Sequence, residues 1–210
     1  MKKKPLLYPV TRAICLGFLK LFFPYEVENG NSLPEDGKMI ICSNHQHALD
    51  PVLIDATQNR LLFYMAKSEL FKFKPFASLI SRYGAFPVYR GKDGGRAIKK
   101  GEELLEDNNC VGVFIEGTRS RTGELLKPHT GAIVLANETD TPIMPCCITG
   151  KKGLIKAFNK TKITYGKPVT AKELGIVEGT LPEYREAAAK VMEIIGKMRE
   201  EHRREFDAKG

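Results

Sequence analysis

The stretch Met39-Ile-Ile-Cys-Ser43 decides the fold class, and it is followed by the polar turn Asn44-His-Gln-His-Ala-Leu49 and by Asp50-Pro51. An uninterrupted apolar run of this length predicts a strand that is covered on both faces, as in parallel sheets. Proline is favoured in the first turn of a helix. The stretch therefore predicts a strand, a turn and a helix in direct succession, which is the repeating unit of α/β folds.

The same alternation continues along the chain. It predicts an α/β fold with a mixed, largely parallel sheet covered by helices. A capping box at Thr180–Glu183 and apolar residues at helical spacing from Tyr184 to Met198 predict one more covering helix at the end. The predicted strands are residues 39–43, 61–65, 85–89, 110–115, 143–149 and 162–165, and the predicted helices between them are 51–59, 75–83, 96–107 and 130–137.

Length and composition limit the architecture to one domain with a short appendage. The chain has 210 residues, of which 42% are hydrophobic and 28% charged. These values are those of an ordinary globular protein and exclude collagen-like and disordered chains. Five cysteines without CxxC spacing predict free thiols rather than disulfides or a zinc site. The adjacent Cys146 and Cys147 are expected to point to the two faces of one strand.

The N-terminal residues carry much of the net charge of +8, because residues 1–25 contain five Lys or Arg and no acid. The apolar run Ile14–Phe23 includes Lys20 and is shorter than the about 20 residues that span a bilayer. We therefore expect residues 1–24 to form a basic amphipathic helix on the cytoplasmic face of an anionic membrane, ahead of one domain at 25–210. The alternatives are a helix packed on the protein's own core and a secretory signal.

Candidate catalytic residues follow the first predicted strand, since ligands of open α/β sheets bind beyond the carboxyl ends of the strands. Asp50 lies five residues after His45, so a turn of this length can bring its carboxylate to one imidazole nitrogen and leave the other as a base. An ordinary helix cap is the alternative role of Asp50. A metal site built from His45, His47 and Asp50, as in a metal-dependent hydrolase, is the alternative for the whole turn.

Two arginines stand at the ends of later predicted strands. Arg90 ends the segment Gly84-Ala-Phe-Pro-Val-Tyr-Arg90, and Arg119 follows the strand in Phe114-Ile-Glu-Gly-Thr-Arg-Ser120. Together they predict a phosphate site, because a guanidinium offers paired donors and stays charged. No phosphate loop or dinucleotide fingerprint is present. The basic segments lack interleaved aromatics apart from Phe71-Lys-Phe-Lys74, so a basic module that binds nucleic acid is not expected.

Four segments in this order resemble the motifs of the glycerolipid acyltransferases, the family of 1-acyl-glycerol-3-phosphate acyltransferases. Asn44-His45-x4-Asp50-Pro51 is similar to the first motif, and the segments ending in Arg90 and Ser120 are similar to the second and third. Pro142-Ile-Met-Pro145 is similar to the fourth. The sequence departs from the family pattern in two places: His47 replaces a usual serine, and Ile115 replaces a usual proline.

The resemblance implies a role for each matching residue. His45 would be the general base for the acceptor hydroxyl, and Asp50 would orient it. Lys67 and Lys127 would contact the phosphate or the acyl donor, and Pro145 would shape the donor side. The acceptor phosphate would be bound by Arg90, Glu116, Gly117, Thr118 and Arg119.

The implied reaction is transfer of a fatty acyl group from an acyl-carrier-protein or coenzyme A thioester to 1-acyl-glycerol 3-phosphate (lysophosphatidic acid), which gives phosphatidic acid. It implies no metal and no organic cofactor. Its partners would be the lysolipid, the thioester and an anionic membrane surface. A different lysolipid or glycerol 3-phosphate as the acceptor remains an alternative.

Overall fold

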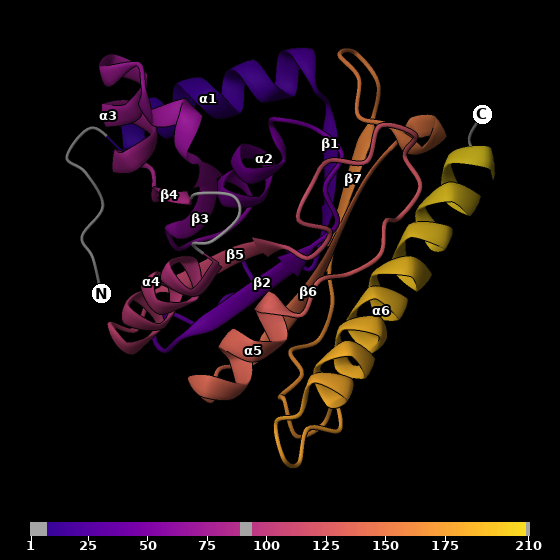
Figure 1. Ribbon diagram of the computed structural model, residues 1–210. Helices are drawn as coiled ribbons and strands as arrows, with labels where there is room; N and C mark the ends of the chain where they lie inside the picture. The colour runs from indigo at the N-terminus through magenta and orange to yellow at the C-terminus, as the bar shows by residue number, and fades with distance from the viewer. Residues whose placement is uncertain (1–7, 89–93, 209–210) are drawn as a thin grey trace.

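The residues described by the computed structural model, 8–88 and 94–208, form a seven-stranded sheet with helices on both faces (Figure 1). Its order is β1-β7-β6-β2-β5-β3-β4, and every neighbouring pair is parallel except β6 and β7. The predicted mixed, largely parallel sheet is therefore confirmed. The strands are β1 (Tyr25–Glu28), β2 (Met39–Ser43), β3 (Leu62–Lys67), β4 (Ala85–Val88), β5 (Cys110–Phe114), β6 (Ile143–Gly150) and β7 (Thr161–Tyr165).

Each predicted helix is present, and the terminal helix is longer than its apolar pattern indicated. The predicted capping box is partly formed, since the Glu183 carboxylate accepts a hydrogen bond from Thr180 N at 3.0 Å. The helices are α1 (Tyr8–Phe22), α2 (Asp50–Ala56), α3 (Lys74–Arg82), α4 (Gly94–Glu106), α5 (Gly131–Glu138) and α6 (Leu181–Ala208), with 3-10 turns η1 (Ser68–Phe71) and η2 (Lys151–Gly153).

Side chains alternate between the two faces of the sheet, so each face has its own core. Ile40 and Cys42 of β2 pack in the core that α4, α5 and α6 cover, whereas Met39 and Ile41 pack with α1 and α2. The neighbouring Cys147 and Cys146 of β6 divide in the same way, as predicted. The cysteines whose side chains are described, Cys42, Cys110, Cys146 and Cys147, are free and buried.

Helix α1 packs one side on the domain and exposes the other. On the packed side, its Leu19 is fully buried, and its Arg12 guanidinium donates to Ala56 O at 2.7 Å and to Gln58 O at 3.2 Å. The opposite side exposes large apolar residues, namely Val10, Ile14, Phe18 and Leu21. Within the described parts of the chain, no helix has the length and apolar character needed to cross a membrane.

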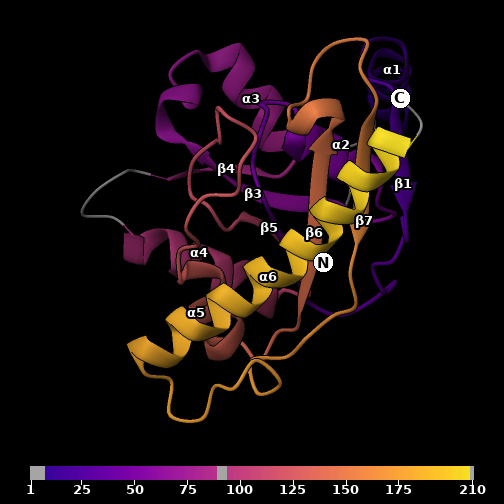
Figure 2. The ribbon, with the colours of Figure 1, turned by 90° about the vertical axis from the view of Figure 1, so that its right-hand side faces the viewer.

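Helix α6 crosses the sheet over β6 and β7 (Figure 2) and brings a buried histidine to it. His202 is 1% exposed, and its Nε2 lies 2.7 Å from Thr164 Oγ1. Next to it, Lys162 forms ion pairs with Glu28, at 2.7 Å, and with Glu205. Burial, together with the positive charge of Lys162, lowers the pKa of His202 to about 4. The imidazole is therefore neutral in the folded protein at physiological pH.

We expect acid to destabilise the fold through His202. Its pKa is lower in the folded chain than in the unfolded chain, so the contribution is fully present above pH 6.5 and falls as the pH drops towards 4. The full loss is about 3 kcal/mol. Urea unfolding at pH 7.5 and pH 5 should show a smaller difference in His202→Gln than in the wild type. His129→Gln, at an exposed histidine, is the matched control. An unchanged pH difference in His202→Gln would rule the histidine out as the cause.

Candidate active site

Asn44 fixes the point at which the chain leaves β2. Its side-chain Nδ2 donates to Ile148 O at 2.9 Å, and its Oδ1 accepts from Ile148 N at the same distance. The carboxamide thus imitates a strand residue and joins the turn to β6, which explains why an amide side chain follows Ser43. Since Asn44 is fully buried, the start of the turn is held rigidly at the carboxyl edge of the sheet.

The turn closes around the carboxylate of Asp50. Asp50 Oδ2 lies 2.7 Å from His45 Nδ1 and also accepts from Gln46 N at 2.6 Å and His47 N at 2.8 Å. Asp50 is fully buried, and the cap position of α2 is Leu49, without a side-chain cap bond. The helix-cap alternative for Asp50 is therefore wrong: its carboxylate shapes the turn and meets the imidazole.

The imidazole of His45 is oriented from two sides. Its ring stacks on Phe114 with centroids 4.0 Å apart and planes at 18°, and Phe114 in turn stacks on Tyr64. An ionised carboxylate can only accept a hydrogen bond, so the neutral imidazole carries its proton on Nδ1. The lone pair of Nε2 is then available to accept a proton. Nε2 has no hydrogen-bond partner among the described residues, and 17% of the side chain is exposed. The geometry provides an accessible base atom on a fixed ring.

Glu116 connects the turn to the loop that follows β5. Its Oε1 accepts from His45 N at 3.0 Å and its Oε2 accepts from Leu126 N at 2.9 Å. Ser120 N donates back to His45 O at 2.8 Å. Glu116 is 2% exposed, so burial raises its pKa, while the two backbone donors act in the opposite direction. Both carboxylate oxygens therefore face the backbone, and this side chain positions the two loops relative to each other.

The loop after β5 presents the exposed residues of the third motif. Gly117 has φ +63°, and a Cβ there would come within 2.9 Å of His129 Cδ2, so the position requires glycine. Gly117, Thr118, Arg119 and Lys127 are exposed, as is Lys67 at the end of β3. The structure thus brings these residues, His45 and Asp50 to the carboxyl edge of the parallel strands.

Of the remaining predicted site residues, one lies outside the described part of the chain and the other lies within a strand. Arg90 lies outside the described residues. Pro145 lies inside β6 opposite Cys42, is buried, and accepts a hydrogen bond at its carbonyl from Gly166 N at 2.8 Å. It is therefore a buried strand residue opposite the penultimate residue of β2.

His47 is turned away from His45. Its Nδ1 accepts from Leu49 N at 3.2 Å, and its ring lies 5.5 Å from that of Phe23, just after α1. No group of three His, Cys, Asp or Glu side chains within residues 8–88 and 94–208 is placed to share a metal ion. The three-ligand arrangement of His45, His47 and Asp50 is therefore not found.

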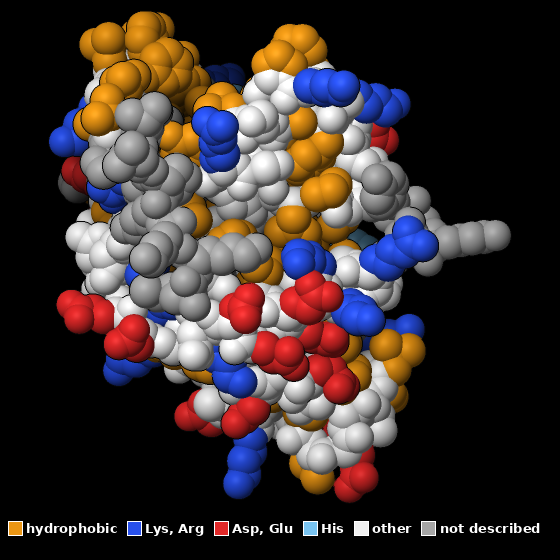
Figure 3. Space-filling view, turned by 90° about the vertical axis from the view of Figure 1, so that its left-hand side faces the viewer, with side chains coloured by type: hydrophobic (Ala, Val, Ile, Leu, Met, Phe, Trp, Pro, Cys, Tyr) orange, Lys and Arg blue, Asp and Glu red, His pale blue; other side chains and the backbone are white. Residues whose placement is uncertain are grey.

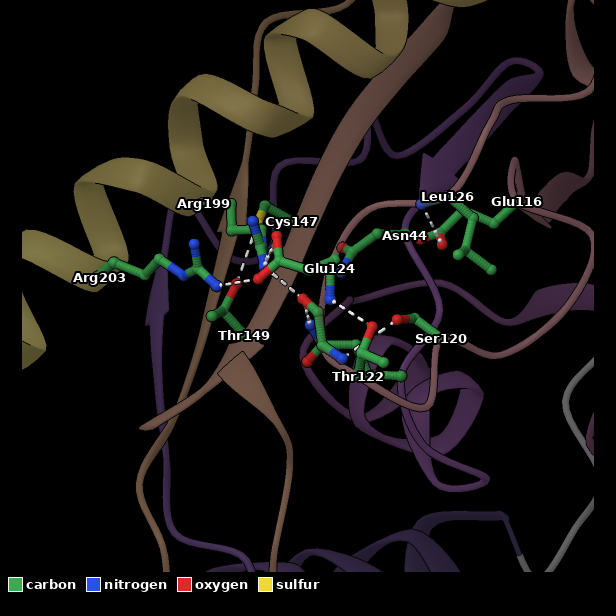
Figure 4. A network of polar contacts seen from close by, with 12 residues as sticks. Asn44, Glu116, Ser120, Thr122, Glu124, Leu126, Cys147, Thr149, Arg199 and Arg203 are labelled. Atoms are coloured by element: carbon green, nitrogen blue, oxygen red, sulfur yellow. Dashed lines mark hydrogen bonds and ion pairs between the residues drawn. The ribbon is translucent and has the colours of Figure 1, made fainter. Parts of the chain in front are cut away.

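Helix α6 contacts and supports the loop that follows β5 (Figure 4). The buried guanidinium of Arg199 donates to Gly123 O and lies 3.0 Å from Glu124 Oε2, and Arg203 pairs with the other Glu124 oxygen at 2.6 Å. Gly123 N in turn donates to Ser120 Oγ at 3.1 Å. Arg199 and Phe114 are the supporting residues that the sequence analysis missed.

A groove of about 440 Å³ lies elsewhere, between α1 and β1, and is lined by residues that include Arg12, Lys20 and Tyr25. None of the residues around His45 lines it. The groove is therefore formed where α1 packs on the domain, and it is separate from the candidate catalytic residues at the edge of the sheet.

Comparison with known proteins identifies this arrangement. The family model described as Acyltransferase matches residues 24–149, which include the His45 turn and the loop of Arg119. The chain belongs to the acyltransferase family. This confirms the resemblance drawn from the four motifs, all of which lie within the matched residues.

The relatives of this acyltransferase are named for one activity. The chain is 31% identical over 147 residues to the 1-acyl-sn-glycerol-3-phosphate acyltransferase of Bacillus subtilis, covering 69% of this chain and 73% of that protein. It is also 31% identical over 125 residues to the human beta enzyme of the same name, covering 58% of this chain and 45% of that protein. The crystal structure of the 1-acyl-sn-glycerophosphate acyltransferase PlsC from Thermotoga maritima matches with a TM-score of 0.72 and 26% identity, covering 92% of this chain and 78% of that one.

Proposed function

We propose that this acyltransferase moves a fatty acyl group from an acyl-carrier-protein or coenzyme A thioester to the free hydroxyl of 1-acyl-sn-glycerol 3-phosphate, forming phosphatidic acid. The observation that carries the proposal is the 2.7 Å contact between His45 and Asp50 next to a loop of exposed cationic residues. The names of the relatives support the same substrate class.

In the proposed mechanism, His45 Nε2 takes the proton of the acceptor hydroxyl while the hydroxyl oxygen attacks the thioester carbonyl carbon. The tetrahedral intermediate collapses as the carbon–sulfur bond breaks, and the imidazolium returns the proton to the leaving thiolate. Asp50 holds Nδ1 and stabilises the imidazolium during this cycle. The chemistry balances without a metal or an organic cofactor.

We assign the acceptor phosphate to the exposed Arg119, with Gly117, Thr118, Lys127 and Lys67 around it. A guanidinium suits a phosphate because it offers two parallel donors. Glu116 is better suited to positioning, since its carboxylate is buried against two backbone amides. The contacts of Arg90 with phosphate and of Pro145 with the donor stay predictions.

Arg119→Ala is expected to raise the acceptor KM by about 10–100-fold, because a hydrogen bond to a charged group contributes about 1.5–3 kcal/mol. The KM of the acyl donor should change little. Arg121→Ala, at an exposed arginine of the same loop, is the matched control. Steady-state kinetics with purified variants measure both constants. An unchanged acceptor KM in Arg119→Ala would place the phosphate elsewhere.

A purified-enzyme assay tests the function itself. Lysophosphatidate, another lysolipid and glycerol 3-phosphate are each offered with acyl-carrier-protein and coenzyme A thioesters, and the products are read by mass spectrometry. We expect phosphatidic acid as the main product, with a rate that a chelator leaves unchanged. Release of free fatty acid without transfer, or loss of turnover on chelation, would favour a metal-dependent hydrolase instead.

We further propose that the exposed side of α1 rests on the cytoplasmic face of an anionic membrane. Gln substitutions at Ile14 and Phe18, which are 68% and 49% exposed, should release the protein from anionic vesicles in sedimentation. This pair is a cleaner test than deletion of residues 1–23, because deletion also removes the buried Leu19. Gln substitutions at the exposed Val177 and Leu181 should leave binding unchanged. Unchanged binding in the α1 variant would contradict the assignment.

A further inference from the structure

We infer that the segment 68–82, formed by η1 and α3, is a second lipid-contact surface that meets the anionic bilayer together with α1 and thereby sets the tilt of the enzyme on it. This inference rests on the proposed function, because it takes a lipid-embedded acceptor as the substrate. The segment contains Phe71-Lys-Phe-Lys74, the one place where aromatic and basic residues alternate in the chain.

The first observation is an apolar stripe that no element among the described residues covers. Leu70, Phe73, Phe76 and Leu79 recur at intervals of three residues and are 45%, 68%, 42% and 50% exposed. No residue of α3 is buried. A helix on a globular protein normally turns its apolar side to the core. Here large apolar side chains point outward over ten residues, which marks a surface that binds something apolar.

The second observation is the charge around the stripe. The exposed cations Lys67, Lys72, Lys74 and Arg82 surround it, and the single acid of residues 67–82 is Glu69. A cationic rim on an aromatic face matches an anionic bilayer, where each Lys or Arg contributes about 1 kcal/mol near the surface. Protruding phenylalanine rings insert between lipids, which a wholly electrostatic contact with an acidic protein would not require.

The third observation is that α3 and α1 lie at the same end of the molecule. Figures 1 and 2 both show α3 and α1 at the upper end of the molecule, and Figure 2 shows that the two helices stand apart at that end. In Figure 3, hydrophobic side chains gather at this end in two groups, while most acidic side chains on that face lie in its lower half. One flat bilayer can therefore contact both helices at the same time.

The fourth observation connects the surface to the active site. Residue 68 follows Lys67 directly, at the carboxyl end of β3, and Phe23 just after α1 lies 5.5 Å from the ring of His47. The two apolar surfaces thus lead into the same edge of the sheet, where His45 lies. A bilayer held by both would face this edge, so an acceptor could present its head group to His45 with its acyl chain still in lipid.

A tryptophan reporter tests the contact directly, because the chain contains no tryptophan. Phe73→Trp should show a blue-shifted emission on addition of phosphatidylglycerol–phosphatidylethanolamine vesicles, and brominated lipids should quench it. Val177→Trp, at an exposed residue close to the start of α6, is the matched control and should not shift. If Phe73→Trp keeps its emission while the protein sediments with the vesicles, the inference is overturned.

A second variant separates the inference from the proposed function. Phe73→Ser combined with Phe76→Ser should weaken vesicle binding by about tenfold or more, since two exposed rings lose their lipid contact. Val177→Ser with Leu181→Ser should not. Turnover of a monomeric short-chain acceptor should remain, and turnover of a vesicle-embedded acceptor should fall.

Two further outcomes would overturn the inference. Unchanged vesicle binding with a raised KM for the acyl-carrier-protein donor would assign the surface to that protein. Unchanged binding with a smaller oligomer in size-exclusion chromatography would assign it to a second copy. Absence of transfer to the short-chain acceptor in the wild type would instead contradict the proposed function and leave the fluorescence result readable by itself.

Discussion

His45→Ala is expected to lower the rate of acyl transfer by about 10²–10⁴-fold, the usual contribution of a general base. The fold should survive, because Asp50 still accepts from Gln46 N and His47 N and so keeps the turn closed. Single-turnover kinetics with saturating acceptor isolate the chemical step from binding. Urea unfolding of the same preparation shows whether the variant is folded.

Two companion variants sharpen this result. Asp50→Asn should also slow transfer, since the amide no longer stabilises an imidazolium at Nδ1. His47→Ala should stay close to the wild type, because that ring contacts Leu49 N and Phe23 and not the His45–Asp50 pair. A folded His45→Ala enzyme with undiminished turnover would remove the base from the mechanism. If His47→Ala were as slow as His45→Ala, His47 would have to take part in catalysis.

Glu116→Gln is expected to have the second largest effect, about 10²-fold in kcat/KM. Its amide NH₂ would face one of the two backbone N–H groups that the carboxylate now accepts, so one hydrogen bond is lost and two donors meet. The unfolding free energy should fall by about 1–3 kcal/mol. Displacement of His45 by about 1 Å is enough for a 10²-fold loss of rate. Both kcat and the acceptor KM should therefore change.

This pattern distinguishes positioning from direct phosphate contact. If the Glu116 carboxylate lay against the phosphate, its neutralisation would relieve repulsion and lower the acceptor KM without changing kcat. Glu124→Gln is the matched control, because Glu124 is exposed and pairs only with α6 arginines in the described structure. Thermal unfolding and steady-state kinetics of the two variants provide the comparison. A stable Glu116→Gln enzyme with only a lower acceptor KM would contradict positioning.

The parts of the site that could be predicted from the sequence are formed by residues close to one another along the chain. His45 and Asp50 are five residues apart, so one turn decides whether they meet. The contact of Glu116 with His45 N spans 71 residues and depends on the pairing of β2 with β5. A buried carboxylate that accepts from two backbone amides has no signature in residue spacing, so the sequence did not indicate these contacts, and the phosphate role of Glu116 is what the family resemblance implied.

The fold was predictable where apolar runs are long and buried. β2 was predicted to the residue because all five of its residues are buried. β1 was missed because its four residues alternate between partly buried and exposed, with Glu26 and Glu28 on the exposed side. Only pairing with β7 makes this segment a strand. For α1, the alternative of a helix packed on the protein's own core describes the side of the buried Leu19, whereas membrane contact of the exposed side stays a prediction.

The hydrogen bond from Arg199 to Gly123 O has a consequence for protein engineering. The match to the family model ends at residue 149, whereas Arg199 lies fifty residues beyond it. A chimera that transplants only the matched portion into a foreign scaffold would keep the His45–Asp50 pair. It would lose the contacts of Arg199 that support the loop of Arg119. Libraries aimed at new acceptors should therefore vary the α6 residues that contact this loop together with the loop itself, because the loop depends on these contacts for its position.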